Sequence, residues 1–393
     1  MKFLHLGDLH LGKALGDFDL MQDQKYMLEQ ILEIIKKEVV DAVLIAGDVY
    51  DKSIPSEAAT NLLDFFINEL SKLNIRTYIV SGNHDSDDRL NYGSMLFESN
   101  NIFISAKFDG ILHRYEIGSG ENAVNVFLLP FVKASQVKHF YPDAEIETYD
   151  DAVRTVIDNA EIDTSECNVL VAHQFVAGKG EDPALSGSES VATQSVGLVE
   201  KIGYDCFDKF DYVALGHIHS PQRVGRDKVR YSGSPLKYSL SEVNNEKTVP
   251  IITIEGKEKV KIELVPLKPM RDLRHIRGEL KELLDERNVK SPEDFIYATL
   301  TDEEVINDAM GIFQQVYPNT VKIDYDNSHT REIEQVDISR IAENKTFSEL
   351  IGDFYSLMYG CEITDEEMIS TPTETEVSLS FESSVAETEE SEV

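Results

Sequence analysis

Five short segments of the sequence combine carboxylate, imidazole and amide side chains with glycine. They are residues 7–12 (GDLHLG), 47–51 (GDVYD), 82–85 (GNHD), 172–174 (AHQ) and 216–219 (GHIH). Half of the ten histidines in the chain fall in these segments. Oxygen and imidazole ligands without a thiolate are typical of manganese, magnesium or iron sites and less typical of structural zinc sites. The segments therefore predict a centre for divalent metal ions.

The spacing within two of the segments predicts that their side chains converge. Asp8 and His10, like His217 and His219, are two residues apart, which in extended backbone places both side chains on one face. Asp48 is the first carboxylate after a predicted strand and is positioned to bridge two ions. Ions about 3.5–4 Å apart can activate a bridging water and hold both oxygens of an in-line phosphoryl displacement. The pattern thus indicates two-metal phosphoesterase chemistry.

One such segment by itself would carry little weight. A D-x-H or G-D pair occurs in many chains, and a single buried histidine is more often a packing residue than a ligand. The prediction depends on five segments that each follow a predicted strand. Active sites of α/β proteins lie at the carboxyl ends of the strands.

Alternating strand and helix signals in the first 260 residues provide those strands. The β-α-β order predicts a sheet with parallel neighbours and helices on its faces. Strands are predicted at residues 3–6, 42–46, 77–80, 124–129, 168–172, 212–215 and 249–254, and helices at 26–39, 56–70 and 150–159, with Ser56 as an N-cap.

A change of pattern near Pro266 predicts a second, smaller α/β module. It would contain a helix at 273–286, a strand at 295–300, a helix at 305–316 and a strand at 321–325. The predicted organisation is a nuclease domain at 1–268, a capping and DNA-binding domain at 269–340, a partner-binding helix within 341–361 and an acidic disordered tail at 362–393.

The net charge of −35 argues at first against a nucleic-acid partner. Residues 362–393 hold eleven acids and no lysine or arginine, so residues 1–361 carry 24 excess negative charges (35 minus 11). Two windows are basic: residues 222–237 have five Lys or Arg against one acid, and residues 257–281 have eight against four. Such windows are either solvated faces or parts of a DNA-binding surface.

The remaining sequence features point to a cytoplasmic protein. No signal-peptide pattern is present and no apolar stretch approaches the roughly 20 residues that span a bilayer, so no membrane partner is expected. Cys167, Cys206 and Cys361 show no CxxC spacing, which favours isolated thiols. Residues 7–13 fit G-x-x-x-x-G-K, but Ala14 follows where a nucleotide-binding loop needs Ser or Thr.

The ordered motifs D-x-H, G-D-x-x-D, G-N-H-D, H and G-H-x-H resemble those of the calcineurin-like metallophosphoesterases. The segments 8–12 (DLHLG), 47–51 (GDVYD), 231–235 (YSGSP) and 266–271 (PLKPMR) are similar to the SbcD branch, the bacterial counterpart of the meiotic-recombination nuclease. The resemblance covers about residues 1–360 and continues through 308–311 (DAMG) and 316–319 (VYPN). It implies an α/β sandwich of two mixed sheets flanked by helices, with a small α/β capping domain.

The resemblance also implies roles for the matching residues. One ion would be held by Asp8, His10, Asp48 and His219, and the other by Asp48, Asn83, His173 and His217. His84 would lie beside the scissile phosphate without binding metal and would act on the transition state or the leaving oxygen. Asp51 and Asp85 would orient imidazole rings, with capping of their own loops as the alternative.

The function implied is that of a metal-dependent DNA nuclease that processes ends in repair, recombination and replication. Such a nuclease is a double-strand exonuclease and a single-strand or hairpin endonuclease. It uses two divalent ions, with manganese expected and magnesium or iron as alternatives. The implied partners are DNA ends and hairpins, an SbcC-type coiled-coil ATPase and a second copy of the chain within a heterotetramer, with localisation at the nucleoid. The amphipathic helix predicted at 347–359 is expected to dock on the ATPase.

Two other functions fit parts of the sequence. A phosphoesterase acting on small molecules or proteins explains the acidity better but gives no purpose to residues 270–359. A non-catalytic adaptor that tethers an ATPase is the other alternative, although such adaptors tend to lose ligands and every expected ligand is present here.

Overall fold

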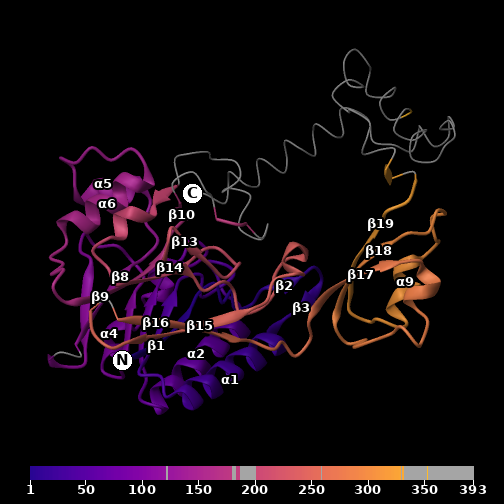
Figure 1. Ribbon diagram of the computed structural model, residues 1–393, viewed down its shortest axis with the longest axis horizontal. Helices are drawn as coiled ribbons and strands as arrows, with labels where there is room; N and C mark the ends of the chain where they lie inside the picture. The colour runs from indigo at the N-terminus through magenta and orange to yellow at the C-terminus, as the bar shows by residue number, and fades with distance from the viewer. Residues whose placement is uncertain are drawn as a thin grey trace. The chain divides into compact units, whose positions relative to one another are not determined.

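The computed structural model describes residues 1–120, 123–178, 183–185, 201–257, 259–328, 330–331 and 352. The chain divides into two compact units (Figure 1). The first comprises Met1–His275 with Ser291–Tyr297, and the second comprises Ile276–Lys290 with Ala298–Val393. The predicted domain borders stay predictions, and the predicted helix at 347–359 and the tail at 362–393 lie outside the described residues.

The first unit is built on two six-stranded mixed sheets. The first sheet has the order β16-β15-β1-β4-β5-β6, in which β1, β4, β5 and β6 run parallel and β15 and β16 are antiparallel to their neighbours. Its strands are β1 (Lys2–Leu6), β4 (Ala42–Ala46), β5 (Arg76–Val80), β6 (Ile102–Ser105), β15 (Thr248–Ile254) and β16 (Val260–Pro266).

The second sheet has the order β13-β14-β12-β9-β8-β7, with a parallel centre from β14 to β8 and an antiparallel strand at each edge. Its strands are β7 (His113–Ile117), β8 (Val124–Leu129), β9 (Cys167–His173), β12 (Tyr212–Gly216), β13 (Gln222–Val224) and β14 (Arg226–Tyr231). The predicted architecture of two mixed sheets flanked by helices is confirmed.

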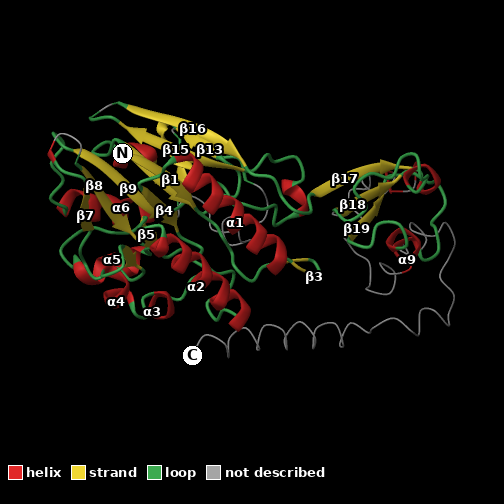
Figure 2. Ribbon diagram, turned by 90° about the horizontal axis from the view of Figure 1, so that it is seen from below, coloured by secondary structure: helices red, strands yellow, loops and turns green. Residues whose placement is uncertain are grey.

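The two sheets pack face to face and helices cover their outer faces (Figure 2). Phe3, Leu44 and Tyr78 of the first sheet share one buried core with Val169 and Tyr212 of the second. The strands are buried on both faces, which explains why they appear in the sequence as continuous apolar runs.

The helices bury amphipathic faces on this sandwich. On the first sheet lie α1 (Met21–Glu38) and α2 (Glu57–Lys72), and on the second lie α5 (Ala134–Phe140) and α6 (Tyr149–Asn159). Ser56 caps α2 as predicted, since its side chain accepts a hydrogen bond from the Ala59 amide at 3.2 Å. Shorter elements are β2 (Ala14–Leu15), β3 (Phe18–Asp19), α3 (Asp87–Leu90), α4 (Ser94–Glu98), β10 (Val176–Ala177), β11 (Ile202–Gly203), η3 (Tyr204–Phe207) and η4 (Leu240–Glu242).

The second module contains a three-stranded sheet in the order β17-β18-β19. Its elements are β17 (Leu273–Gly278), α8 (Leu280–Leu283), β18 (Phe295–Leu300), α9 (Ala309–Gln314) and β19 (Thr320–Tyr325). The predicted helix at 273–286 is therefore wrong. Good helix formers dominate that stretch, but pairing with β18 gives its first half a strand conformation, which local propensity cannot reveal.

The helix predicted at 305–316 is shorter in the structure. It begins after Asp308, whose backbone is left-handed (φ 53°) and whose side chain accepts a hydrogen bond from the Gly311 amide at 3.2 Å. The strands predicted in the first unit coincide with observed strands to within one residue at each end. The edge strands β7 and β16 and the parallel strands β6 and β14 were not predicted.

Two further expectations concern the described part of the chain. None of its helices is long and apolar enough to cross a membrane. Cys167 and Cys206 are buried free thiols, in accord with the absence of a disulfide or zinc pattern.

The two sheets approach each other most closely where β12 and β4 end. A Cβ atom on Gly216, the last residue of β12, would lie 1.8 Å from the carbonyl oxygen of Ala46, the last residue of β4. Only glycine fits at this contact, because the neighbouring atom is backbone and cannot rotate away.

Substitution Gly216→Ala is expected to destabilise the first unit by about 1–3 kcal/mol or more, because the sheet ends must separate. Urea denaturation followed by circular dichroism measures the change. Gly278→Ala is the matched control, since Gly278 also ends a strand and its added Cβ would meet atoms only at 3.4 Å. Equal stability of the two variants would contradict this account of the contact.

Candidate metal centre

The five polar segments all follow strands whose carboxyl ends meet at one edge of the sandwich. Three follow β1, β4 and β5 of the first sheet, and two follow β9 and β12 of the second. Hydrogen bonds join the two groups: His173 Nδ1 donates to the Ala46 carbonyl at 2.8 Å, and the His217 amide donates to Asp8 Oδ1 at 2.8 Å. The predicted placement of the segments at strand ends is confirmed.

The backbone of these loops is not extended, which corrects one argument from spacing. Asp8, His10 and Asp48 have φ values of 53°, 43° and 47°, and His217 has a φ of 104°. Left-handed turns, rare for residues other than glycine, aim the side chains at one another. Backbone hydrogen bonds from Asp8 to the Gly47 carbonyl (3.1 Å) and from His10 to the Asp48 carbonyl (2.9 Å) hold the turns in place.

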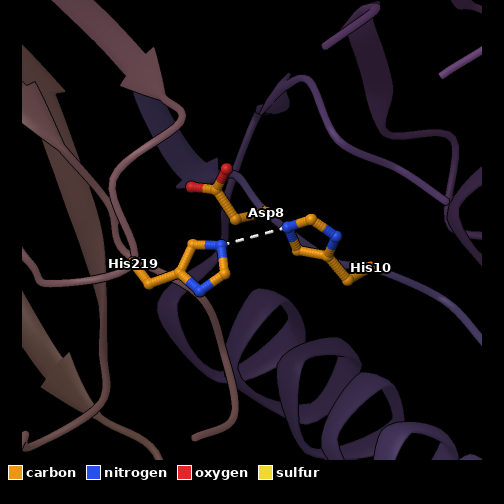
Figure 3. Close-up of side chains that lie close together, drawn as sticks. All are labelled: Asp8, His10 and His219. Atoms are coloured by element: carbon orange, nitrogen blue, oxygen red, sulfur yellow. Dashed lines mark hydrogen bonds between the residues drawn. The ribbon is translucent and has the colours of Figure 1, made fainter. Parts of the chain in front are cut away.

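Asp8, His10 and His219 form a buried group whose acceptors face one another (Figure 3). The Nε2 atoms of the two histidines lie 3.0 Å apart. Asp8 Oδ2 is buried and has no hydrogen-bond partner. Buried polar atoms are almost always satisfied in native proteins, so these atoms fit a bound cation.

A second group comprises Asp48, Asn83, His173 and His217. His173 Nε2 lies 3.1 Å from Asn83 Oδ1 and 3.4 Å from Asp48 Oδ2, and His217 Nδ1 lies 3.0 Å from the same Asn83 oxygen. Because Nδ1 of His173 donates to a carbonyl, Nε2 of the neutral ring is an acceptor directed at other acceptors. This arrangement also fits a cation.

Asp48 lies between the two groups. Its Oδ2 is 3.5 Å from His10 Nε2 of the first group and 3.4 Å from His173 Nε2 of the second. The side chain is 3% exposed, and its remaining oxygen accepts the His84 amide at 2.9 Å. Its position is that of a carboxylate able to contact two ions at once.

Burial sets the protonation states of the imidazoles. It lowers the pKa of His10 to about 4 and that of His217 to about 3. Burial also opposes the charged form of His173, but the carboxylates of Asp48 and Asp8 raise its pKa to about 9. Without an ion, a proton on His173 would therefore supply the positive charge that these carboxylates require.

His84 lies at the open side of the site. Its Nδ1 donates to the Asp51 carbonyl at 2.9 Å, which leaves Nε2 as the second ring atom available for chemistry, and its ring centroid is 4.8 Å from that of His10. His84 is half-buried and Asn83 is exposed, whereas the other candidate ligands are buried. His84 also lies close enough to His10 and Asp48 to join a metal-binding group.

The carboxylates of Asp51 and Asp85 have different partners. Asp51 Oδ1 accepts the Lys13 ammonium at 2.7 Å and lies 3.4 Å from His10 Nδ1. Burial opposes its charged form, but hydrogen bonding to His10 and Lys13 holds its pKa below the usual range. Lys13, the lysine of the nucleotide-loop pattern, is thus engaged within the protein.

Asp85 accepts three backbone hydrogen bonds. They come from the amides of Gly82 and Val49 (2.9 and 3.1 Å) and from that of Tyr50 (2.9 Å). These bonds join the loop after β5 to the loop after β4, as the loop-capping alternative requires. A Cβ on Gly82 would lie 2.1 Å from Asp48 Oδ1, so glycine is needed for the close approach of these loops.

Four residues beside the site were not found in the sequence, because they belong to no short motif. Gln24 Nε2 donates to the His10 carbonyl at 2.7 Å, and the Tyr238 hydroxyl donates to the Leu9 carbonyl at 2.5 Å. Glu242 Oε1 lies 3.3 Å from His219 Nδ1, and Lys247 Nζ lies 2.5 Å from Glu242 Oε2. Only the tertiary structure brings these helix and loop residues to the site.

Comparisons with known proteins accord with this geometry. The family described as calcineurin-like phosphoesterase matches residues 1–221, and the family described as type 5 capsule protein repressor C-terminal domain matches residues 269–359. A Staphylococcus epidermidis protein, named as the SbcD component of nuclease SbcCD, is 37% identical over 354 residues, which are 88% of this chain and 92% of that protein.

Two solved structures are also similar. A dimetal phosphatase from Danio rerio is 12% identical, with a TM-score of 0.37 over 68% of this chain and 99% of that one. An inner-membrane-complex anchor of Plasmodium is 13% identical, with a TM-score of 0.36 over 84% of this chain and 98% of that one. The family match over residues 1–221 and the 37% identity to the Staphylococcus protein show that the chain belongs to the calcineurin-like phosphoesterases and, among them, to the SbcD nuclease family.

Proposed function

We propose that this chain is the nuclease subunit of an ATPase–nuclease complex and hydrolyses phosphodiester bonds at DNA ends and hairpins with two divalent ions. The observation that carries the proposal is the pair of buried acceptor groups that share Asp48, because such groups require cations. The 37% identity to a nuclease component, which extends over 88% of the chain, supports DNA as the substrate.

In the proposed site the two ions have separate ligand sets. The first ion would be held by Asp8, His10, Asp48 and His219, and the second by Asp48, Asn83, His173 and His217. Two ions of this kind supply Lewis acidity and a hydroxide nucleophile near neutral pH. Oxygen and imidazole ligands suit manganese, with magnesium or iron as alternatives.

His84 would act on the substrate and not on the ions. Its Nδ1–H is held by the Asp51 carbonyl, so the ring has a defined orientation with Nε2 on the other side. In the protonated state this imidazole can donate to a phosphate oxygen or to the leaving oxygen. Asn83 and His84 lie at the solvent-accessible side of the site, which is where DNA would approach.

The basic windows contribute less positive charge to DNA binding than their composition suggests. Arg223, Arg226 and Arg274 form ion pairs with Asp227, Asp208 and Asp294, respectively. Neutralised pairs release few counterions from DNA. The proposed complex would therefore rely on the two ions and on a basic surface of the ATPase subunit. Docking of that subunit on residues 347–359 stays a prediction.

The function is tested with hairpin and linear duplex DNA in manganese buffer, with and without the candidate ATPase. The full-length chain should cleave DNA, and the ATPase with ATP should stimulate cleavage. Asp48→Asn should abolish turnover and lower metal occupancy at both sites, because both ions lose a ligand.

Other outcomes of this assay identify the alternatives. Turnover of a small phosphodiester such as bis(p-nitrophenyl) phosphate without DNA cleavage would indicate a small-molecule phosphoesterase. Two bound ions without any turnover would indicate an adaptor. Full activity of Asp48→Asn with both ions bound would contradict the bridging role.

His84→Ala is expected to reduce the cleavage rate by about 10²–10⁴, the usual range for a positioned acid–base group. Metal content, measured by plasma mass spectrometry, should stay at the wild-type stoichiometry. Loss of one ion from the variant would show instead that His84 is a ligand.

We also propose that the chain forms a homodimer through the segment that follows the GNHD loop. Tyr92, Met95 and Leu96 are 85%, 87% and 75% exposed and lie next to and within α4. Neighbouring exposed apolar side chains mark interaction surfaces, and a two-fold axis would bury the same patch on both copies. The interface would then lie close to both active sites.

The double substitution Met95→Asp and Leu96→Asp should convert the dimer to a monomer, because two charges per copy would be buried in the interface. Light scattering after size-exclusion chromatography measures the mass. Ile111→Asp is the control, since Ile111 is 61% exposed but outside the patch. A dimer that survives the double substitution would place the interface elsewhere.

A further inference from the structure

A buried carboxylate lies behind the first ligand group and outside the five loops. Glu242, the last residue of η4, is 0% exposed. Its Oε1 lies 3.3 Å from Nδ1 of His219, on the side of the ring away from His10. An ionised carboxylate is costly to bury unless it is paired and hydrogen-bonded, so this position requires a partner.

Lys247 is that partner and also contacts the histidine itself. Its Nζ lies 2.5 Å from Glu242 Oε2 and donates to the His219 carbonyl at 2.9 Å and to Ser234 Oγ at 2.8 Å. The lysine is 6% exposed. One buried ion pair therefore holds both the imidazole and the backbone of His219.

These contacts determine which ring nitrogen of His219 carries the proton. A carboxylate only accepts hydrogen bonds, so Nδ1 of His219 must be the donor toward Glu242. Nε2 is then unprotonated and faces Nε2 of His10 at 3.0 Å, within the group that includes Asp8. This is the nitrogen that a metal ion would use.

The corresponding contact in the second group is of a different kind. Nδ1 of His173 donates to the neutral carbonyl of Ala46 at 2.8 Å, not to a charged side chain. A carboxylate partner makes an imidazole a more basic ligand than a carbonyl partner does. The two ligand groups are thus supported by acceptors of different charge.

We propose that Glu242 and Lys247 form a positioning pair that holds His219 in the tautomer and orientation needed to bind the first ion. The proposal rests on the ligand set given above, in which His219 binds that ion and His173 the other. It assigns a site-selective role: loss of the carboxylate should weaken the first ion and leave the second in place.

The test is a manganese titration of the metal-free, full-length chain, with unbound Mn²⁺ quantified by electron paramagnetic resonance. Glu242→Gln keeps the side-chain volume but leaves one acceptor oxygen for two donors, Nδ1 of His219 and Nζ of Lys247. The dissociation constant of one of the two ions should rise by about 10–100-fold, and that of the other should stay at the wild-type value. Cleavage of DNA by the variant should recover at raised manganese, which a misfolded site would not allow.

Two further variants separate positioning from folding. Lys247→Met leaves a buried carboxylate without a cation and is expected to lower the melting temperature. The double variant Glu242→Gln with Lys247→Met restores charge balance, so it should melt higher than Lys247→Met while still binding the first ion weakly. Lys237→Met is the matched control, because Lys237 donates to the Val243 and Leu273 carbonyls at 2.8 and 3.1 Å and should leave both ions unaffected.

The outcomes distinguish this inference from the function on which it rests. His219→Ala should lose the first ion, and retention of both ions in that variant would overturn the ligand set and the positioning pair with it. If His219→Ala loses an ion while Glu242→Gln and the double variant bind both ions with wild-type affinity, the positioning pair alone is overturned.

Discussion

The contact between the carboxyl ends of β4 and β12 is where the two sheets of the sandwich meet. Gly216 lies against the Ala46 carbonyl with no room for a side chain, and that carbonyl accepts the hydrogen bond from His173. The loops of one sheet therefore reach the loops of the other. Asp8 from the first sheet accepts the backbone amide of His217 from the second. Neither sheet carries a complete ligand group by itself.

This packing buries several carboxylates and imidazoles together, and their charges control the local chemistry. Burial keeps His10 and His217 neutral near pH 7, whereas Asp48 and Asp8 favour a positive charge on His173. The unsatisfied oxygen of Asp8 and the facing nitrogens of His10 and His219 show the same need for a cation. Divalent ions would meet it while leaving the imidazoles neutral, which is the state in which they bind metal.

A layer of polar residues behind the site holds the ligands in place. Asp85 joins two loops through three amides, Gln24 holds the backbone of His10, and Glu242 with Lys247 holds His219. These residues come from a loop, from α1 and from the region after β14. Ligands supported in this way lose little conformational entropy when ions bind, which favours a rigid two-ion site.

The sequence by itself determined the strands, the five polar segments that follow them and the family, because buried parallel strands are continuous apolar runs and the ligand motifs are local. Only the tertiary structure decided how the ligands converge. Asp8, His10 and Asp48 do so through left-handed turns and not through extended backbone. Glu242 and Lys247 reach His219 only after folding, and the strand at Leu273–Gly278 depends on pairing with β18. Contacts between residues distant in the chain leave no local pattern, so sequence periodicity cannot reveal them.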